Sequence, residues 1–253
     1  MGTSKFILKA ANTLVSYVVV ISLCIAGGYA AYALWDNSLV YAEIDDVRAE
    51  MLKLKPGIGE DQPTFDELLA INSDVVGWVT IDNTIMDYPI VQGKTNLTYI
   101  NKDIYGDFAL AGSIFLDSRN DKNFEDGYSL LYGHSISSGR MFADINLYKE
   151  ESFFKKNQTG SLLTLDKSYD LKIFVTLVVP SNEVEIFNPN FWGDNIDELI
   201  EYVDNNALFL NEDIMEEMRA MEDLQILALT TCSFEFTDAR TVILAVMEPN
   251  STE

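Results

Sequence analysis

The chain begins with a long uncharged run between Ala10 and Trp35. As a helix rising about 1.5 Å per residue, this run would extend about 39 Å, which is enough to cross a bilayer. Lys5 and Lys9 precede it and acidic residues follow it, so the positive-inside rule predicts a cytoplasmic N-terminus and an exported remainder. The sequence Ala31-Tyr32-Ala33 also has the form of a signal-peptide cleavage site, but the run is longer than a signal core, which favours an anchor.

Helical spacing of apolar residues returns in three later segments. Between residues 37 and 55 the period predicts a stalk helix. Thr64 and Glu67 have the spacing of a capping box, which predicts a short helix after the stalk. Farther along, a helical insert is expected to hold two helices, one capped by Asp194 and one by Asn211.

The remaining pattern consists of short runs rich in β-branched and aromatic residues, which is typical of strands. Eight such runs are present: Val75–Ile81, Met86–Val91, Ser113–Leu116, Tyr128–Tyr132, Ser161–Leu165, Leu171–Val179, Leu224–Thr231 and Thr241–Met247. Eight strands with few helices predict a mainly β domain, built as a closed barrel or as a sandwich.

These elements predict four parts of the 253-residue chain. They are a cytoplasmic N-terminus at residues 1–9, a transmembrane anchor at 10–35, a stalk helix with a linker at 36–63, and a β domain at 64–253. The last part is long enough for one compact core, and a second large domain is not expected.

Composition adds a strong acidic bias, with 17 basic and 40 acidic residues and a formal net charge of −23. Such a surface repels nucleic acid and anionic lipid, so we expect no nucleic-acid partner. The acidic residues are spread along the chain, which is typical of a solvated exterior. The charge therefore predicts no specific function.

The cysteines and the histidine limit the chemistry further. Cys24 lies in the uncharged run and Cys232 in the β domain, so a disulfide between them is implausible and Cys232 is expected to be a free thiol. One histidine and one accessible cysteine fall short of a zinc ligand set, and the chain has no twelve-residue calcium loop. A calcium or magnesium ion bound by carboxylates stays open in so acidic a chain, but we predict no metal among the site residues and no cofactor.

Three residues with useful chemistry lie at predicted strand ends. Cys232 follows one apolar strand and Arg240 precedes the next, so a connecting loop puts the thiol and the guanidinium at the same end of neighbouring strands. His134 follows another strand and begins a polar loop. Each alone has an ordinary interpretation, as a buried thiol or a surface histidine. Together, at strand-to-loop junctions, they favour a nucleophile with a proton-transfer partner.

The motifs around these residues resemble the sortase family, and class B sortases in particular. The resemblance covers nearly the whole chain and rests on NSDVVGWVTIDNTIMDYPIVQG, GSIFLDSRN, LLYGHSISSGRMF, FFKK and TTCSFEFTDAR. The helical insert before the cysteine strand and the N-terminal anchor also fit. The family motif TLxTC reads ALTTC at residues 228–232, so its first position departs from the pattern.

The resemblance implies a closed eight-stranded β-barrel with short peripheral helices, held at the outer face of a Gram-positive cell membrane. It implies a cysteine transpeptidase that cuts a C-terminal sorting signal of an exported surface protein and joins the new carboxyl end to an amine. That amine would come from a cell-wall peptide or a pilin lysine. The implied catalytic residues are Cys232, His134 and Arg240, and the implied substrate contacts are Thr230, Tyr132 and Asn101.

The residue types suit this chemistry. A thiol with a pKa of about 8.5 needs a positive neighbour to become the attacking thiolate near neutral pH. His134 can protonate the leaving amine and later accept a proton from the incoming one. Arg240 stays protonated, so it can donate to an oxyanion but cannot act as a base.

Two other interpretations share the same residues. The first is another extracellular cysteine peptidase or an L,D-transpeptidase-like cross-linker, although Thr230-Thr231 precede the cysteine here where such cross-linkers typically carry a His-Gly pair. The second is a non-catalytic extracellular β-domain for adhesion or peptide binding, in which Cys232 is packed. A thiol-directed reagent distinguishes the second, because a core thiol resists it and an activated cleft thiol does not.

Overall fold

The computed structural model describes residues 2–57, 63–136, 139–192, 196–221, 223–232 and 238–250, and at residues 2–4, 196–197 and 232 it describes the backbone alone. The chain divides into two compact units, Met1–Val47 and Arg48–Glu253. Every strand of the described chain belongs to the second unit.

Helix α1 runs without a break from Gly2 to Leu52. Among the described residues, it is the one helix whose length and composition suit a membrane span, with a mean hydropathy of 2.0 in its most apolar window. The predicted anchor at residues 10–35 and most of the stalk helix predicted at 37–55 are therefore parts of one helix. The domain boundaries predicted after residues 9, 35 and 63 remain predictions.

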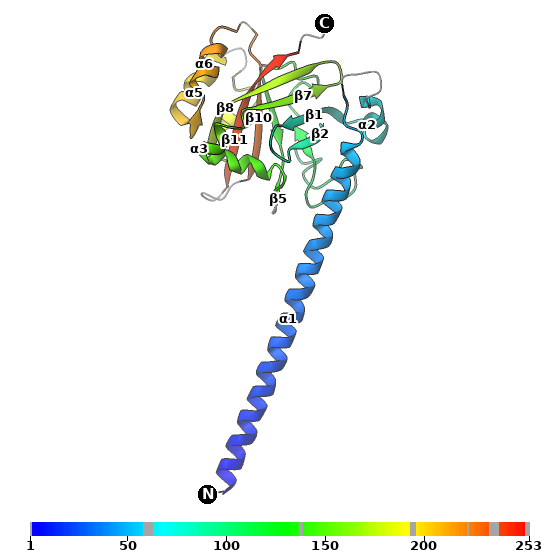
Figure 1. Cartoon of the computed structure of the whole chain (residues 1–253), viewed down its shortest axis with the longest axis vertical. Coiled ribbons are helices and arrows are strands. Elements are labelled where there is room, and N and C mark those ends of the chain that lie inside the picture. Colours follow the sequence, from blue (N-terminus) through cyan, green and yellow to red (C-terminus); the bar gives the residue numbers. More distant parts are fainter. Residues whose placement is uncertain are drawn as a thin grey trace. The chain divides into compact units, whose positions relative to one another are not determined.

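The second unit is built on a β-sheet that closes on itself (Figure 1). The strand order is β11-β10-β4-β3-β2-β1-β7-β8, and β8 pairs back onto β11, so the eight strands form the predicted closed barrel and not a sandwich. Their bounds are β1 Val75–Ile81, β2 Asp87–Val91, β3 Ile114–Leu116, β4 Tyr128–Tyr132, β7 Thr159–Thr164, β8 Ser168–Pro180, β10 Ile226–Cys232 and β11 Ala239–Pro249.

Three short strands were not predicted from the sequence. Strand β9 (Phe209–Leu210) adds to the open side of β8. Strands β5 (Ser135–Ile136) and β6 (Arg140–Met141) form a separate two-stranded sheet directly after β4. The segment expected to be a polar loop after His134 therefore begins and ends with paired backbone.

The helices after α1 are short. They are α2 Phe65–Ile71, the 3-10 helix η1 Ala143–Lys149, α3 Glu151–Phe154, α4 Val184–Phe187, α5 Ile196–Asn206 and α6 Glu212–Met218. Helix α2 precedes β1 in the chain, and the others lie between strands of the sequence. Two of the predicted caps are confirmed, because the side chain of Thr64 accepts from Asp66 N and that of Asn211 accepts from Asp213 N. The predicted cap Asp194 lies outside the described residues.

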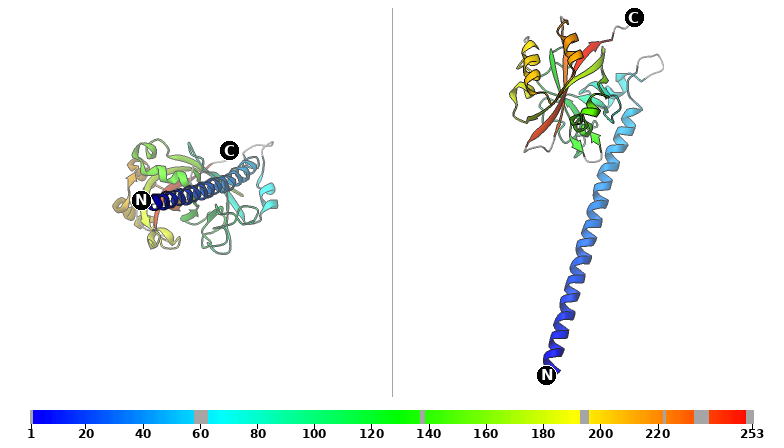
Figure 2. Two further views of the ribbon diagram at one scale, coloured as in Figure 1. Left: turned by 90° about the horizontal axis from the view of Figure 1, so that it is seen from below. Right: turned by 60° about the vertical axis from the view of Figure 1, so that its left-hand side comes forward.

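Helices α5 and α6 lie side by side on one flank of the barrel, as the views of Figures 1 and 2 agree. They bury an apolar face against β4, β8, β10 and β11, with Leu199, Val203, Met215 and Met218 in one cluster with Phe174 and Val242. The strands beneath them are consequently buried along most of their length. Such packing makes the ends of these strands well-fixed supports for a site.

Candidate active site

Strand register brings the predicted catalytic residues to one end of the barrel. Strands β4 and β10 run parallel with Tyr132 opposite Thr230, and Gly133 N donates to Thr230 O at 3.2 Å. Strands β10 and β11 run antiparallel with Cys232 opposite Arg240. His134, Cys232 and Arg240 therefore lie at the same edge of three neighbouring strands. The side chain of Cys232 lies outside the described part of the chain, so its place is given by its backbone.

A close approach of the backbone sets the position of His134. A Cβ atom on Gly133 would come within 2.6 Å of both Ile114 Cδ1 and Phe142 Cγ, so only glycine fits there without a shift. On the far side, His134 O accepts from Phe142 N at 3.0 Å. The imidazole is held separately, because His134 Nε2 lies 2.8 Å from the carbonyl oxygen of Ile100 in the β2–β3 loop.

Arg240 is held by strands on both sides. Its Cα is paired with Cys232 of β10 and with Val179 of β8. The side chain is half-buried, and Nη1 donates to the carbonyl of Ala239 at 3.0 Å. A guanidinium has five N–H donors, so this contact leaves donors for another partner.

His134 and Arg240 both line a cleft with a volume of about 300 Å³. The lining residues are Asn96, Leu97, Ile100, Phe115, Tyr132, Gly133, His134, Ser181, Phe187, Thr230, Thr231 and Arg240. Apolar walls with a few polar groups are typical of a site for a peptide or a small ligand. Within the described residues, no cluster of three or more His, Cys, Asp and Glu side chains is arranged to hold a metal ion.

Two of the three predicted substrate contacts line this cleft. Thr230 and Tyr132 are lining residues, but their hydroxyls bond within the protein, to Thr241 O at 3.4 Å and to Asp117 Oδ2 at 3.1 Å. Asn101 is exposed and is not among the lining residues found in the described chain. Its neighbour Ile100 lines the cleft instead.

Sequence reasoning missed several residues of the cleft wall. Asn96 and Leu97 lie in the β2–β3 loop, Ser181 follows β8, and Phe187 ends α4. No local pattern marks these positions, because loops of distant sequence meet at the barrel end only after the strands pair. The sequence did hold one signal nearby, which is the charged residue Asp117 directly after a predicted strand in the stretch GSIFLDSRN. The structure buries this residue completely.

Comparison with known proteins identifies the family. The model of the sortase domain matches residues 79–248. This match covers more than half of the chain, which therefore belongs to the sortase family, whose members are cysteine transpeptidases.

The relatives narrow the assignment to class B sortases. Sortase B of Listeria monocytogenes is 35% identical over 144 residues, which are 56% of this chain and 58% of that protein. The crystal structure of a Streptococcus pyogenes class B sortase involved in pilus biogenesis aligns with a TM-score of 0.66 at 35% identity, covering 73% of this chain and 97% of that one. Sortase B from Bacillus anthracis aligns with a TM-score of 0.69 at 28% identity, covering 84% and 99%.

Proposed function

We propose that this chain cleaves a C-terminal sorting signal of exported proteins through a thioacyl-enzyme on Cys232 and transfers the new carboxyl end to an amine. The observation that carries the proposal is the strand register, in which Cys232 is opposite Arg240 while β4 ends beside β10 and leads into His134. Membership of the sortase family supports the same reaction.

In the first half-reaction the thiolate of Cys232 attacks the scissile carbonyl carbon. Arg240 donates N–H groups to the oxyanion that forms on the carbonyl oxygen. When the carbon–nitrogen bond breaks, the imidazolium of His134 gives its proton to the leaving amine. The products of this step are a thioester on Cys232, a neutral imidazole and the released C-terminal fragment.

In the second half-reaction an acceptor amine attacks the thioester. Neutral His134 takes the proton that the amine loses, the carbon–sulfur bond breaks, and a new amide bond forms. Cys232 leaves as a thiolate and His134 is again an imidazolium. Both groups have then returned to their starting states, so one histidine serves both steps.

The contact of His134 with Ile100 suggests which ring nitrogen exchanges the proton. A carbonyl oxygen can only accept a hydrogen bond, so Nε2 carries the hydrogen that points to Ile100 O. Nδ1 is then the nitrogen that is protonated in the imidazolium and unprotonated in the neutral form. We propose that Nδ1 delivers the proton to the leaving amine and accepts it from the incoming one.

The acceptor amine is proposed to belong to a cell-wall peptide or to the lysine of a pilin. The aligned Streptococcus pyogenes sortase is involved in pilus biogenesis, which supports the second source. Supplying both kinds of amine to the same acyl-enzyme and weighing the products distinguishes the two.

The transfer itself predicts ping-pong kinetics. Without an amine, the acyl-enzyme should break down more slowly than it forms and should therefore accumulate. We expect the full-length chain, incubated with a pool of sorting-signal peptides, to gain the mass of an acyl group on Cys232. Added amine should shorten the lifetime of this species, because the amine competes with water for the thioester. Mass spectrometry at successive times measures the decay with and without amine.

Hydroxylamine, a small nucleophile that attacks thioesters, is the matched positive control for this decay. It should release the acyl group even if the natural acceptor is absent from the amines tried. An acyl-enzyme that decays rapidly in water and at the same rate with every amine would contradict transfer and leave a hydrolase.

We also propose that α1 anchors the catalytic domain outside the cell membrane. Its single candidate span and the two lysines before the uncharged run support this orientation. Protease added to intact cells should then digest the domain and spare an N-terminal fragment, as detected with tags at each end. A domain that is protected in intact cells and digested only after lysis would contradict the orientation.

A further inference from the structure

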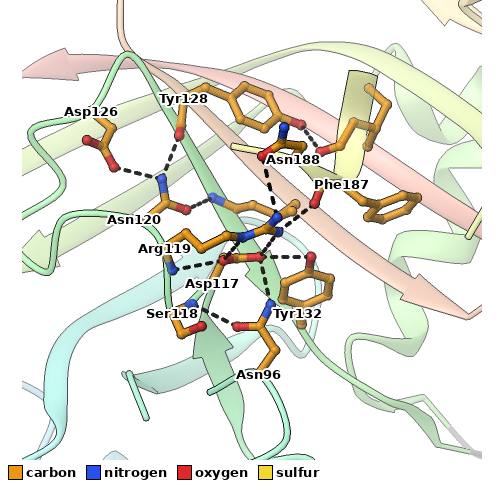
Figure 3. Close-up of polar contacts among 12 residues, drawn as sticks. Asn96, Asp117, Ser118, Arg119, Asn120, Asp126, Tyr128, Tyr132, Phe187 and Asn188 are labelled. Carbon is orange, nitrogen blue, oxygen red and sulfur yellow. Dashed lines mark hydrogen bonds and ion pairs between the residues drawn. The ribbon is translucent and has the colours of Figure 1, made fainter. Parts of the chain in front are cut away.

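Asp117 is a completely buried carboxylate at the end of β3, and it accepts five hydrogen bonds (Figure 3). Arg119 supplies three of them, from its backbone N at 3.0 Å, from Nε at 2.8 Å and from Nη2 at 2.6 Å. Asn96 Nδ2 donates at 2.8 Å and the Tyr132 hydroxyl at 3.1 Å. A buried charge with this many partners is well satisfied, and any partner removed leaves it undersolvated.

The residues tied to Asp117 come from three different elements that line the cleft. Asn96 and Tyr132 line the cleft and bond Asp117 directly. Arg119 Nη2 also donates to the carbonyl of Phe187 at 2.6 Å, and Phe187 is a further lining residue of the cleft. The β2–β3 loop, the end of β4 and helix α4 are thus held by one ion pair.

Aromatic packing joins these elements along one wall of the cleft. The ring of Tyr132 stacks between Phe115, with centroids 5.2 Å apart, and Phe187, with centroids 6.5 Å apart. All three rings line the cleft. Fixing the hydroxyl of Tyr132 and the carbonyl of Phe187 therefore fixes the spacing of an aromatic wall.

Asp117 also reaches His134 by two routes. Tyr132 lies two residues before His134 on the same strand end. Asn96 lies in the loop that presents the Ile100 carbonyl to His134 Nε2, and its Oδ1 accepts from Ser118 N at 2.7 Å. Both routes are backbone segments that would shift if the carboxylate lost its partners.

The electrostatics keep this cluster in one ionisation state at neutral pH. Burial alone would raise the pKa of Asp117, but the hydrogen bonds and charge of Arg119 outweigh burial and hold that pKa below its usual value. The hydrogen bond to Asp117 raises the pKa of Arg119. Burial and the neighbouring carboxylate raise the pKa of Tyr132, so its hydroxyl remains a donor.

We infer that Asp117 is a positioning residue for the transpeptidase reaction, which ties the three cleft-lining elements together through Asn96, Tyr132 and the Arg119–Phe187 contact. The inference rests on the proposed function. Asp117 itself does not line the cleft or take part in the chemistry. Its effect is to keep the peptide-binding walls, and the carbonyl that orients His134, at a fixed separation.

The test compares Asp117→Asn with Asp126→Asn in the full-length chain in detergent. Asp126 is a matched control, because it is a half-buried carboxylate in the same segment of the chain. It accepts two hydrogen bonds, from Asn120 Nδ2 at 2.8 Å and from Asp121 N at 2.7 Å. It contacts none of the cleft-lining residues through those bonds. The substrate is the peptide that the wild type cleaves fastest in a randomised fluorogenic library, with hydroxylamine as the amine.

We expect Asp117→Asn to lower kcat/KM by about 10-fold to 100-fold, mainly through a higher KM, because binding walls that shift by a fraction of an ångström to one ångström no longer match the peptide. Asp126→Asn should stay within about twofold of wild type. A merely less stable variant has fewer folded molecules, which lowers the apparent kcat and leaves KM unchanged. A wild-type KM for Asp117→Asn would overturn the inference.

Two variants cover the case in which Asp117→Asn fails to fold. Tyr132→Phe removes one hydroxyl and keeps the stacked ring, and Arg119→Lys keeps the charge but loses the fork that joins Asp117 to Phe187. Both should raise KM, with the larger increase in Arg119→Lys. A wild-type KM in both variants would overturn the positioning role.

Hydrogen exchange provides a readout that needs no substrate, so the inference and the proposed function can fail separately. In Asp117→Asn, the amides of Phe187 and Asn188, which donate to Glu183 O and Val184 O, should exchange faster than in wild type. Asp126→Asn should leave them unchanged. A library that the wild type does not cleave would sink the proposed function, whereas equal exchange in the two variants would sink the positioning role.

Discussion

Replacing Cys232 with alanine should abolish both acyl-enzyme formation and peptide cleavage, with a loss of turnover of about 10⁴-fold or more. Both half-reactions of the proposed mechanism pass through a thioester on Cys232, and alanine has no thiol to form it. Intact-protein mass spectrometry should show no acyl adduct on the variant at any time. Peptide release should fall to the background of the uncatalysed reaction.

Cys24→Ala is the matched control, because it removes the other cysteine of the chain, which is exposed in α1. This variant should form the acyl-enzyme and turn over as the wild type does. If Cys232→Ala still forms the acyl adduct and Cys24→Ala does not, then Cys24 is the nucleophile and the assignment of Cys232 is wrong. Residual turnover above one-tenth of wild type in Cys232→Ala would reject the thioacyl mechanism altogether.

Arg240→Lys should lower kcat by about 100-fold to 1,000-fold, which is the usual cost of removing an oxyanion donor. A lysine keeps the positive charge near Cys232 but not the planar fork of the guanidinium. One donor of that fork already bonds Ala239 O, so the arginine can hold its own backbone and a substrate oxygen together. An ammonium on a flexible stem cannot do both in one fixed geometry.

Arg219→Lys is a matched control for this substitution. Arg219 is largely exposed and its Nη2 lies 3.6 Å from Asp204 Oδ2 on the outer helices, so the same chemical change there should leave kcat unaltered. A positive charge near Cys232 also favours its thiolate, and the rate of alkylation by iodoacetamide measures that effect separately. Because lysine keeps the charge, Arg240→Lys should be alkylated about as fast as the wild type. If Arg240→Lys has nearly normal kcat, Arg240 contributes only long-range charge and the oxyanion role is wrong.

The secondary structure of the barrel was largely readable from local pattern. The predicted bounds of β1 and β4 agree with the structure at both ends, because turn-forming residues flank each apolar run. Strands β8 and β11 are longer than predicted. They pair from Ala239 opposite Pro180 to Pro249 opposite Tyr169, and this closure of the barrel extends both strands past their apolar runs.

The candidate catalytic residues were also accessible from the sequence. Cys232 and Arg240 flank one connection between two strands, so their proximity follows from chain connectivity, and the register confirms that they are opposite one another. The proximity of His134 did not follow in the same way. It depends on the parallel pairing of β4 with β10, whose sequences lie far apart. The resemblance to sortases supplied that link before the structure did.

The sequence by itself determined the apolar helix, the positions of the eight strands along the chain and the residue types available for chemistry, because each depends on neighbours along the chain. Only the tertiary structure decided which distant segments form the cleft. Asn96, Tyr132 and Phe187 meet because strands that are far apart in the sequence pair into a closed barrel. The buried Asp117–Arg119 pair then fixes their separation, since a charge in the interior is stable only where several donors converge on it.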